Sequence, residues 1–186
     1  MLLFAITAMK WTLLLIFTVL TLNCVGQDTQ IPTNTQTNKA EYSEVVSLSG
    51  VDKAELYTRA LNWVKDFYPN PNGTIKSQES PNSIAGKSRF TIKQTDKKGR
   101  TIGQSYVNYH FKFDFKEGKY KYTIHKIGWQ QPSYFDVSKW EKTNSPGYQA
   151  ETYPVYVKQT LEYFNALIKS FEQAISSLGA KESDDW

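Results

Sequence analysis

Apolar residues recur along this chain at two different periods, and the change of period separates helix from strand. Before Pro69 the apolar positions are three or four residues apart, which is the spacing of one face of an α-helix. The members of this stripe are Leu56, Ala60, Trp63, Val64 and Phe67. Asp52 precedes the stripe and Glu55 follows three positions later, which is the form of a capping box. The pattern predicts a helix that begins after Asp52 and ends before Pro69.

Beyond this helix the chain alternates between apolar and polar residues, which is typical of strands buried on one face only. The predicted strands are Glu41–Leu48, Thr74–Glu79, Ser83–Thr95, Thr101–Phe115 and the stretch from Tyr120 to Trp129. The turn segments between them are Ser80-Pro81-Asn82, Asp96-Lys97-Lys98-Gly99 and Glu117-Gly118. Strands joined by such short turns indicate one antiparallel sheet of about five strands.

The last of these turns predicts the register of the two strands beside it. If Glu117-Gly118 is a two-residue turn, the numbers of facing residues sum to 235. Phe115 then faces Tyr120 on the apolar side, and His110 faces His125 on the polar side. The two histidines of the chain are therefore predicted to be cross-strand neighbours, with Cβ atoms ~5 Å apart.

The C-terminal part of the chain predicts a long helix after a long connection, Gln130–Glu151. From about Tyr153 the apolar residues are alternately four and three positions apart, and Gly179 is a suitable stop. The stripe consists of Val157, Leu161, Phe164, Ile168, Phe171, Ile175 and Leu178. Two helices must bury a stripe each, and the sheet offers one apolar face. The pattern therefore predicts an α+β domain with two helices packed on one face of the sheet and the other face open.

The first 26 residues have the pattern of a secretory signal peptide. Trp11–Leu22 is an apolar run preceded by Lys10, and Cys24-Val25-Gly26 is a small-x-small cleavage site. We therefore expect a mature chain that begins near Gln27 and is secreted or periplasmic. Two alternatives remain open: a lipid anchor on Cys24 in the cell envelope, and an uncleaved anchor.

The segments on either side of the domain are polar. Residues 27–40 are rich in Thr, Asn and Gln and have almost no apolar content, which predicts a disordered linker. Residues 181–186 are an acidic tail that we expect to be frayed. The single domain with its C-terminal helix is accordingly predicted over residues 41–180.

Residues Tyr42–Trp129 resemble a known family. The resemblance lies in YSEVVSLSGVDKAELYTRALNWV (Tyr42–Val64), TIKSQE (Thr74–Glu79) and IAGKSRF (Ile84–Phe90), above all in the helix start Glu-Leu-Tyr-x-Arg-Ala and the strand Ala-Gly-Lys. These segments are similar to the domain of unknown function 4468 family, described as TBP-like and common in exported proteins of Bacteroidota. The resemblance implies a curved antiparallel sheet with helices on one side. It implies no activity, no functional residues and no binding of DNA.

Composition narrows the chemistry that the domain can perform. Cys24 is the only cysteine, so the mature domain has no disulfide and no cysteine-based metal site. Without Lys10 the chain carries 21 basic residues against 18 acidic ones, and a net charge of +3 does not indicate a nucleic-acid partner. The motifs of P-loop, dinucleotide-binding, zinc-protease and serine-hydrolase enzymes are absent. We predict no catalytic residue, no cofactor and no metal site.

The predicted open face of the sheet is the best candidate for a binding surface. It mixes basic and aromatic side chains, which suit an anionic or sugar-like ligand through charge and stacking. The candidate binding residues are Arg89, Tyr106, His110, Lys112, His125 and Trp129. The alternative interpretation is an ordinary solvated sheet face whose charges prevent aggregation.

The leading functional hypothesis is a non-enzymatic domain that binds a ligand or another protein of the cell envelope. It has no nucleic-acid partner, and its only membrane contact is the signal sequence or a lipid on Cys24. One alternative is an enzyme with a site between the open face and the Gln130–Glu151 connection, which would require clustered acids or histidines with a perturbed pKa. The other alternative is a purely structural accessory domain.

Overall fold

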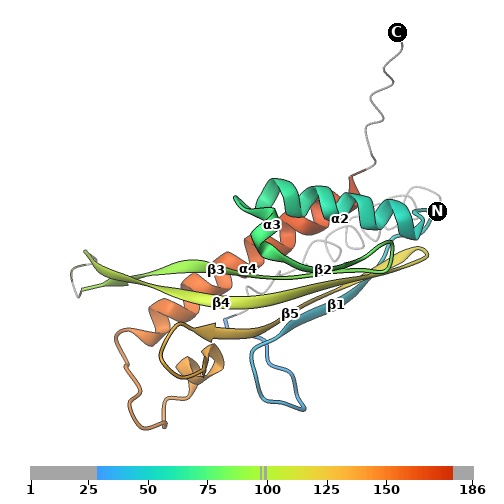
Figure 1. Ribbon diagram of the computed structural model, residues 1–186. Helices are drawn as coiled ribbons and strands as arrows, with labels where there is room; N and C mark the ends of the chain where they lie inside the picture. The colour runs from blue at the N-terminus through green and yellow to red at the C-terminus, as the bar shows by residue number, and fades with distance from the viewer. Residues whose placement is uncertain (1–28, 97, 99, 178–186) are drawn as a thin grey trace, which may run out of the picture.

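The protein is an antiparallel sheet with two long helices across one of its faces, as a computed structural model shows (Figure 1). The structure describes residues 29–96, 98 and 100–177. The predicted signal peptide over residues 1–26, the predicted helix stop at Gly179 and the predicted acidic tail lie outside these residues. Among the helices of the described ranges, none is long and apolar enough to cross a membrane.

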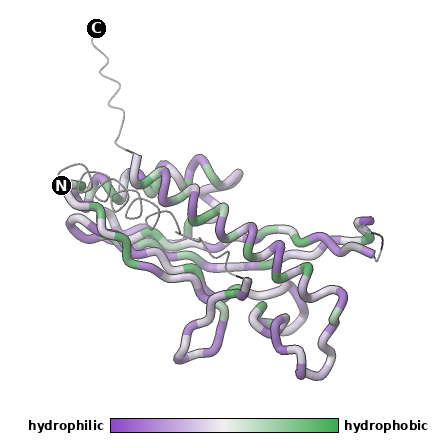
Figure 2. The backbone as a smooth tube through the Cα atoms, turned by 180° about the vertical axis from the view of Figure 1, so that it is seen from behind, coloured by the Kyte–Doolittle hydropathy of each residue, from purple (hydrophilic) through white to green (hydrophobic). Residues whose placement is uncertain are grey.

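The sheet follows the order β1-β5-β4-β3-β2, with β6 beside β5, and all neighbours are antiparallel. Its strands are β1 (Tyr42–Ser47), β2 (Ile75–Glu79), β3 (Ser83–Thr95), β4 (Thr101–Lys116), β5 (Lys119–Trp129) and β6 (Phe135–Asp136). All five predicted strands are present, and β6 is too short to produce a period in the sequence. Figure 2 shows hydrophobic and hydrophilic residues alternating along the strands.

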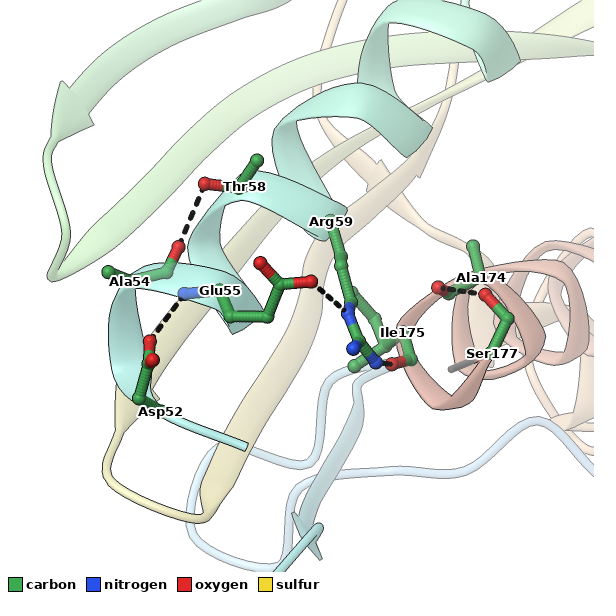
Figure 3. Close-up of polar contacts among 8 residues, drawn as sticks. All are labelled: Asp52, Ala54, Glu55, Thr58, Arg59, Ala174, Ile175 and Ser177. Carbon is green, nitrogen blue, oxygen red and sulfur yellow. Dashed lines mark hydrogen bonds and ion pairs between the residues drawn. The ribbon is translucent and has the colours of Figure 1, made fainter. Parts of the chain in front are cut away.

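The two long helices are α2 (Lys53–Phe67) and α4 (Tyr153–Ser176), and a short helix α3 (Pro71–Thr74) follows α2. α2 begins at the predicted cap, where the backbone N–H of Glu55 donates to the Asp52 carboxylate at 2.7 Å. Arg59 of α2 reaches α4: its guanidinium donates to the Glu55 carboxylate and to the carbonyl of Ile175, both at 2.7 Å (Figure 3). This contact links the two helices. The elements together confirm the predicted α+β class.

The core between helices and sheet is aromatic. The ring of Trp63 on α2 lies edge-on to Phe113 of β4 and Phe171 of α4, with centroid distances of 5.9 and 5.0 Å. Phe113 and Phe171 stack on each other at 4.1 Å. Tyr68 connects this group to Phe111, with the two rings stacked at 5.5 Å. Because both helices contact the same strand residue, they cover the same face of the sheet.

The register of β4 and β5 is the predicted one. From Lys116 opposite Lys119 to His110 opposite His125, the numbers of all recorded facing pairs sum to 235. Gly118 has a φ of 64°, a conformation that favours glycine, and this residue permits the tight turn.

The register changes beyond His125, where β5 contains a bulge at Lys126. Lys126 has a φ of 51°, and one extra residue of β5 lies between the facing pairs His110–His125 and Asn108–Gly128. A bulge of one residue moves each later side chain to the opposite face of the sheet.

The bulge makes the predicted position of Trp129 wrong. Trp129 faces Val107, which is fully buried, and lies on the helix-covered face instead of the open face. Its ring lies 5.9 Å from that of Trp140 and 5.8 Å from that of Tyr156, and its Nε1 donates to the hydroxyl of Ser105 at 2.7 Å. Trp129 is therefore a packing residue.

The Gln130–Glu151 connection is more structured than the sequence pattern indicates. It contains β6 and a 3-10 helix, η1 (Val137–Glu141). The carboxylate of Asp136 accepts a hydrogen bond from the Ser138 N–H at 3.0 Å and so caps η1. Trp140 is 1% exposed and anchors the connection in the core.

The prediction of a disordered linker over residues 27–40 is wrong from Ile31 onward. Ile31 and Ala40 are 3% and 1% exposed. The Ile31 N–H donates to the carboxylate of Glu141 at 3.0 Å, and the Ala40 N–H donates to that of Asp136 at 3.1 Å. Two acidic side chains of the connection thus hold a segment whose composition alone favours disorder, and the ordered domain begins before residue 41.

Candidate functional site

One face of the sheet has no helix on it, and we call this surface the open face. Its side chains come from alternate positions of the three central strands, and their facing pairs follow from the register. The open face consists of Lys87, Arg89, Thr91, Tyr106, Asn108, His110, Lys112, Asp114, Lys121, Thr123 and His125. Five of the six predicted binding residues therefore share this surface, and Trp129 does not.

Cations on the open face outnumber its acids. Lys87, Arg89 and Lys121 are exposed, and Lys126 joins them at the bulge. The one carboxylate of the face, Asp114, forms a salt bridge with Lys112 at 2.7 Å. In the part of the chain that the structure describes, none of the other four cations has a carboxylate within 4 Å. The surface is therefore positively charged.

The guanidinium of Arg89 lies over the ring of Tyr106 on the open face. The guanidinium carbon lies 4.4 Å from the centroid of the tyrosine ring, a cation–π contact between diagonal positions of β3 and β4. Such a contact stabilises an exposed pair by about 0.5–1 kcal/mol and orders the long side chain. The edge N–H groups of a stacked guanidinium stay available for a carboxylate, sulfate or phosphate oxygen.

His110 and His125 lie at the centre of the open face, with ring centroids 5.7 Å apart. Partial burial lowers the pKa of both side chains below the usual value of 6.5, and the charge of Lys126 lowers both further. His125 and Lys87 also lower the pKa of His110, whereas Glu41 acts in the opposite direction on His125. Both imidazoles are therefore mostly uncharged at neutral pH, and they gain charge on acidification.

A depression of about 240 Å³ opens where the open face meets the Gln130–Glu151 connection. Its lining residues are Asn108, His110, Lys126, Gly128, Trp129, Gln130, Gln131, Ser133 and Tyr134. Tyr134 is 54% exposed, and its hydroxyl donates to the carboxylate of Asp136 at 2.9 Å. The depression offers amide, imidazole and ammonium groups beside an exposed aromatic ring, a combination whose chemistry suits a polar, negatively charged molecule.

Two groups of this site are absent from the sequence prediction. Lys126 reaches the histidine pair because the bulge turns it there, and no period in the sequence shows a bulge. Lys87 faces His110 across the strand pair and lies two positions before Arg89, so strand alternation places both on the same face. Within residues 29–96, 98 and 100–177, no three metal-ligating side chains gather in one place.

Comparisons with known proteins agree with this geometry. Residues 42–130 match the family described as a domain of unknown function with a TBP-like fold, DUF4468. A TBP-like protein from Parabacteroides distasonis is 14% identical, with a TM-score of 0.64 over 79% of this chain and 97% of that chain. A DUF4468 family protein from Bacteroides ovatus is 15% identical, with a TM-score of 0.63 over 82% of this chain and 92% of that chain. At these identities the two structures show a shared fold alone.

Among curated proteins, none matches the chain. The family match covers β1 through β5 with α2 and α3, and therefore includes the whole open face. Residues 42–130 of this chain therefore match the DUF4468 family, a family of domains with a TBP-like fold.

Proposed function

We propose that this protein is a non-enzymatic, exported binding domain whose open face takes an extended polyanion, such as an acidic polysaccharide. The observation that carries the proposal is the group of cations without acidic partners, Lys87, Arg89, Lys121 and Lys126, around an uncharged histidine pair. Charges placed this way attract anions and are not neutralised by the protein itself. The apolar run Trp11–Leu22 supports export. We propose that the protein is secreted or periplasmic, and the alternative is attachment to the cell envelope through a lipid on Cys24.

The spread of the cations favours a long ligand over a single small anion. Arg89 faces Asn108 and Lys121 faces Asp114, so the two cations lie six positions apart along β4. At about 3.3 Å per residue, six positions separate them by roughly 20 Å. One phosphate or carboxylate cannot contact both ends, whereas a chain of acidic sugars can.

The depression beside the connection supports binding better than catalysis. Its lining contains His110 and Lys126 but no carboxylate. Acid–base catalysis by this site would need a second group to orient or complement the histidine. The polar groups there suit the hydroxyl groups of a sugar, and the exposed ring of Tyr134 suits stacking on a sugar face.

Titration with defined oligosaccharides tests the proposal. We expect calorimetric binding of a heparin-derived or polygalacturonate oligosaccharide in low salt, and no binding of neutral dextran of the same length. The affinity should fall by about tenfold or more between about 20 and 200 mM sodium chloride, because neutralised anions release their counterions. Equal binding of dextran, or no binding of either acidic oligosaccharide in low salt, would contradict the proposal.

Acidification should strengthen this binding. Because the pKa values of His110 and His125 lie below 6.5, both rings gain most of their charge well below neutral pH. We expect the affinity for the acidic oligosaccharide to rise about fivefold from pH 8 to pH 5, since each protonated imidazole adds a cation to the site. The double variant His110→Gln with His125→Gln should keep the binding at pH 8 and lose this rise.

The same shifts predict the direction of the stability change. Between the lowered pKa values and 6.5 the unfolded chain binds more protons than the folded chain, so the free energy of unfolding decreases as the pH falls through this window. Thermal melts at each pH therefore accompany the titrations and confirm that the protein is folded. If the affinity for the acidic oligosaccharide changed with pH in the same way in the native protein and in the double variant, groups other than the two histidines would cause the change.

A further inference from the structure

One edge of β3 is largely free of neighbouring strands. β4 pairs with β3 along its whole length, whereas β2 pairs with it only from Ser83 to Gly86 (Figure 1). At Gly86 the carbonyl oxygen of Thr74 comes so close that an added Cβ would lie 2.7 Å from it. Beyond Gly86 no strand of the described chain lies on the side of β3 away from β4. We call the segment Lys87–Thr91, which has no strand partner on that side, the free edge.

Just beyond the free edge, the backbone of Lys93 forms hydrogen bonds with a side-chain amide group. The side chain of Gln159 on α4 accepts a hydrogen bond from the Lys93 N–H at 2.8 Å and donates one to the Lys93 carbonyl at 3.0 Å. One side-chain amide thus makes both bonds that a residue of an added strand would make. Since both backbone groups of Lys93 point away from β4, the alternation of an antiparallel ladder directs those of Arg89 and Thr91 the same way.

A cavity of about 780 Å³ lies beside the free edge, and its lining includes residues of both faces of the sheet. Its lining residues are Tyr68, Pro69, Asn70, Gly73, Thr74, Lys87, Ser88, Arg89, Asn108, Tyr109 and His110. Ser88 is the small residue that leaves space on the floor, in a strand whose neighbouring position on the same face is Phe90. The hydroxyl oxygen of Tyr109 lies 3.2 Å from that of Tyr68 and 2.8 Å from that of Tyr163, so the wall of the cavity is fixed by a chain of hydroxyl groups.

We propose that the free edge binds an extended acidic segment of a partner protein as an additional strand of the sheet. Its main chain would pair with the outward peptide groups of Arg89 and Thr91, which is how an exposed sheet edge binds peptides. Alternate side chains of an added strand point to opposite faces. One set would enter the cavity beside Tyr68, and the other set would lie next to the exposed side chains of Lys87 and Arg89, which favour glutamate or aspartate.

Charge also excludes a second copy of this chain as the occupant. Two copies that paired antiparallel about Arg89 would place the two Arg89 side chains opposite each other. Pairing about Thr91 would place Arg89 opposite Lys93, and pairing about Lys87 would place two lysines opposite each other. Like charges on facing positions destabilise a strand pair, and exposed edges carry them to prevent such association.

A proline at the free edge tests the strand pairing without changing the charges. The probe is a fluorescein-labelled synthetic peptide of alternating glutamate and valine, about seven residues long, whose binding is measured by fluorescence anisotropy. Thr91→Pro removes one outward N–H and leaves the ladder to β4, since proline is tolerated at sheet edges. We expect the peptide affinity to fall about 5- to 10-fold in Thr91→Pro and to change less than twofold in the matched variant Thr91→Ala.

A second measurement applies to the unaltered protein and does not depend on the folding of the proline variant. A peptide methylated on alternate backbone nitrogens keeps its charges but cannot donate to the free edge, so its affinity should fall by a similar factor. Equal binding of the methylated and unmethylated peptides, or no binding of the peptide, would overturn the proposal. A concentration-dependent dimer in analytical ultracentrifugation would instead show that a second copy occupies the edge.

This inference differs from the polyanion site in its dependence on the peptide groups of β3, although both proposals use the side chains of Lys87 and Arg89. Thr91→Pro should leave the affinity for the acidic oligosaccharide within about twofold, since the variant changes no charge. Loss of peptide binding with retained oligosaccharide binding, or the reverse, therefore tells which of the two proposals fails.

Discussion

Replacement of Trp63 by alanine should lower the free energy of unfolding by about 3–5 kcal/mol. Trp63 is 6% exposed, and its ring contacts those of Phe67, Phe113 and Phe171 at centroid distances of 4.6, 5.9 and 5.0 Å. The Nε1 group also donates to the hydroxyl of Ser170 at 3.0 Å. Truncation would leave a cavity between α2, α4 and β4, whose backbones cannot close over it. Urea denaturation followed by circular dichroism measures the change.

Tyr134→Ala is a suitable control for this variant. Tyr134 is also a large aromatic residue, but it is 54% exposed, so its removal should change the free energy of unfolding by less than about 1 kcal/mol. A loss below about 1 kcal/mol for Trp63→Ala as well would mean that Trp63 is not part of the core.

Reversal of two charges on the open face should nearly abolish polyanion binding. Lys87 and Arg89 are exposed and have no carboxylate within 4 Å in the described part of the chain, so both are available to an anion. In the double variant Lys87→Glu with Arg89→Glu, two attractions become two repulsions. We expect the affinity for the acidic oligosaccharide to fall at least about 30-fold, because several charge-assisted contacts are lost together. Calorimetric titration in low salt measures this loss.

The control carries the same change of net charge on the other side of the molecule. Lys65 of α2 and Lys169 of α4 are both exposed on the helix layer. Lys65→Glu with Lys169→Glu should weaken binding by less than about threefold, through the long-range field alone. If the two double variants lost the same affinity, binding would follow net charge and the open face would not be a specific site.

Local signals in the sequence predicted most of the architecture. Asp52 with Glu55 located the start of α2, and the short turn at Glu117-Gly118 set the register that brings His110 opposite His125. In both cases the deciding interaction lies within a few residues, so that a single sequence contains all of it. The side of the sheet on which five of the six candidate residues lie followed from the same alternation.

The errors arose where the deciding interaction is distant. Strict alternation gave Trp129 the wrong face, because the bulge at Lys126 adds one residue and the residue with the positive φ is a lysine, not a glycine. The polar segment around Ile31 is ordered by Glu141, which lies 110 residues away. The free edge of β3 likewise depends on where β2 ends, which no local pattern of β3 itself determines.

The central claim is that the open face, and not the helix layer, binds the polyanion, and nitrogen-15 NMR of the labelled domain tests it most directly. Addition of the acidic oligosaccharide should shift the backbone amide signals of Lys87, Arg89, Asn108 and His110, together with that of Lys126 at the bulge. The amide signals of α2 and α4 should remain in place. Shifts concentrated on the two helices, with the signals of β3 and β4 unchanged, would contradict the claim.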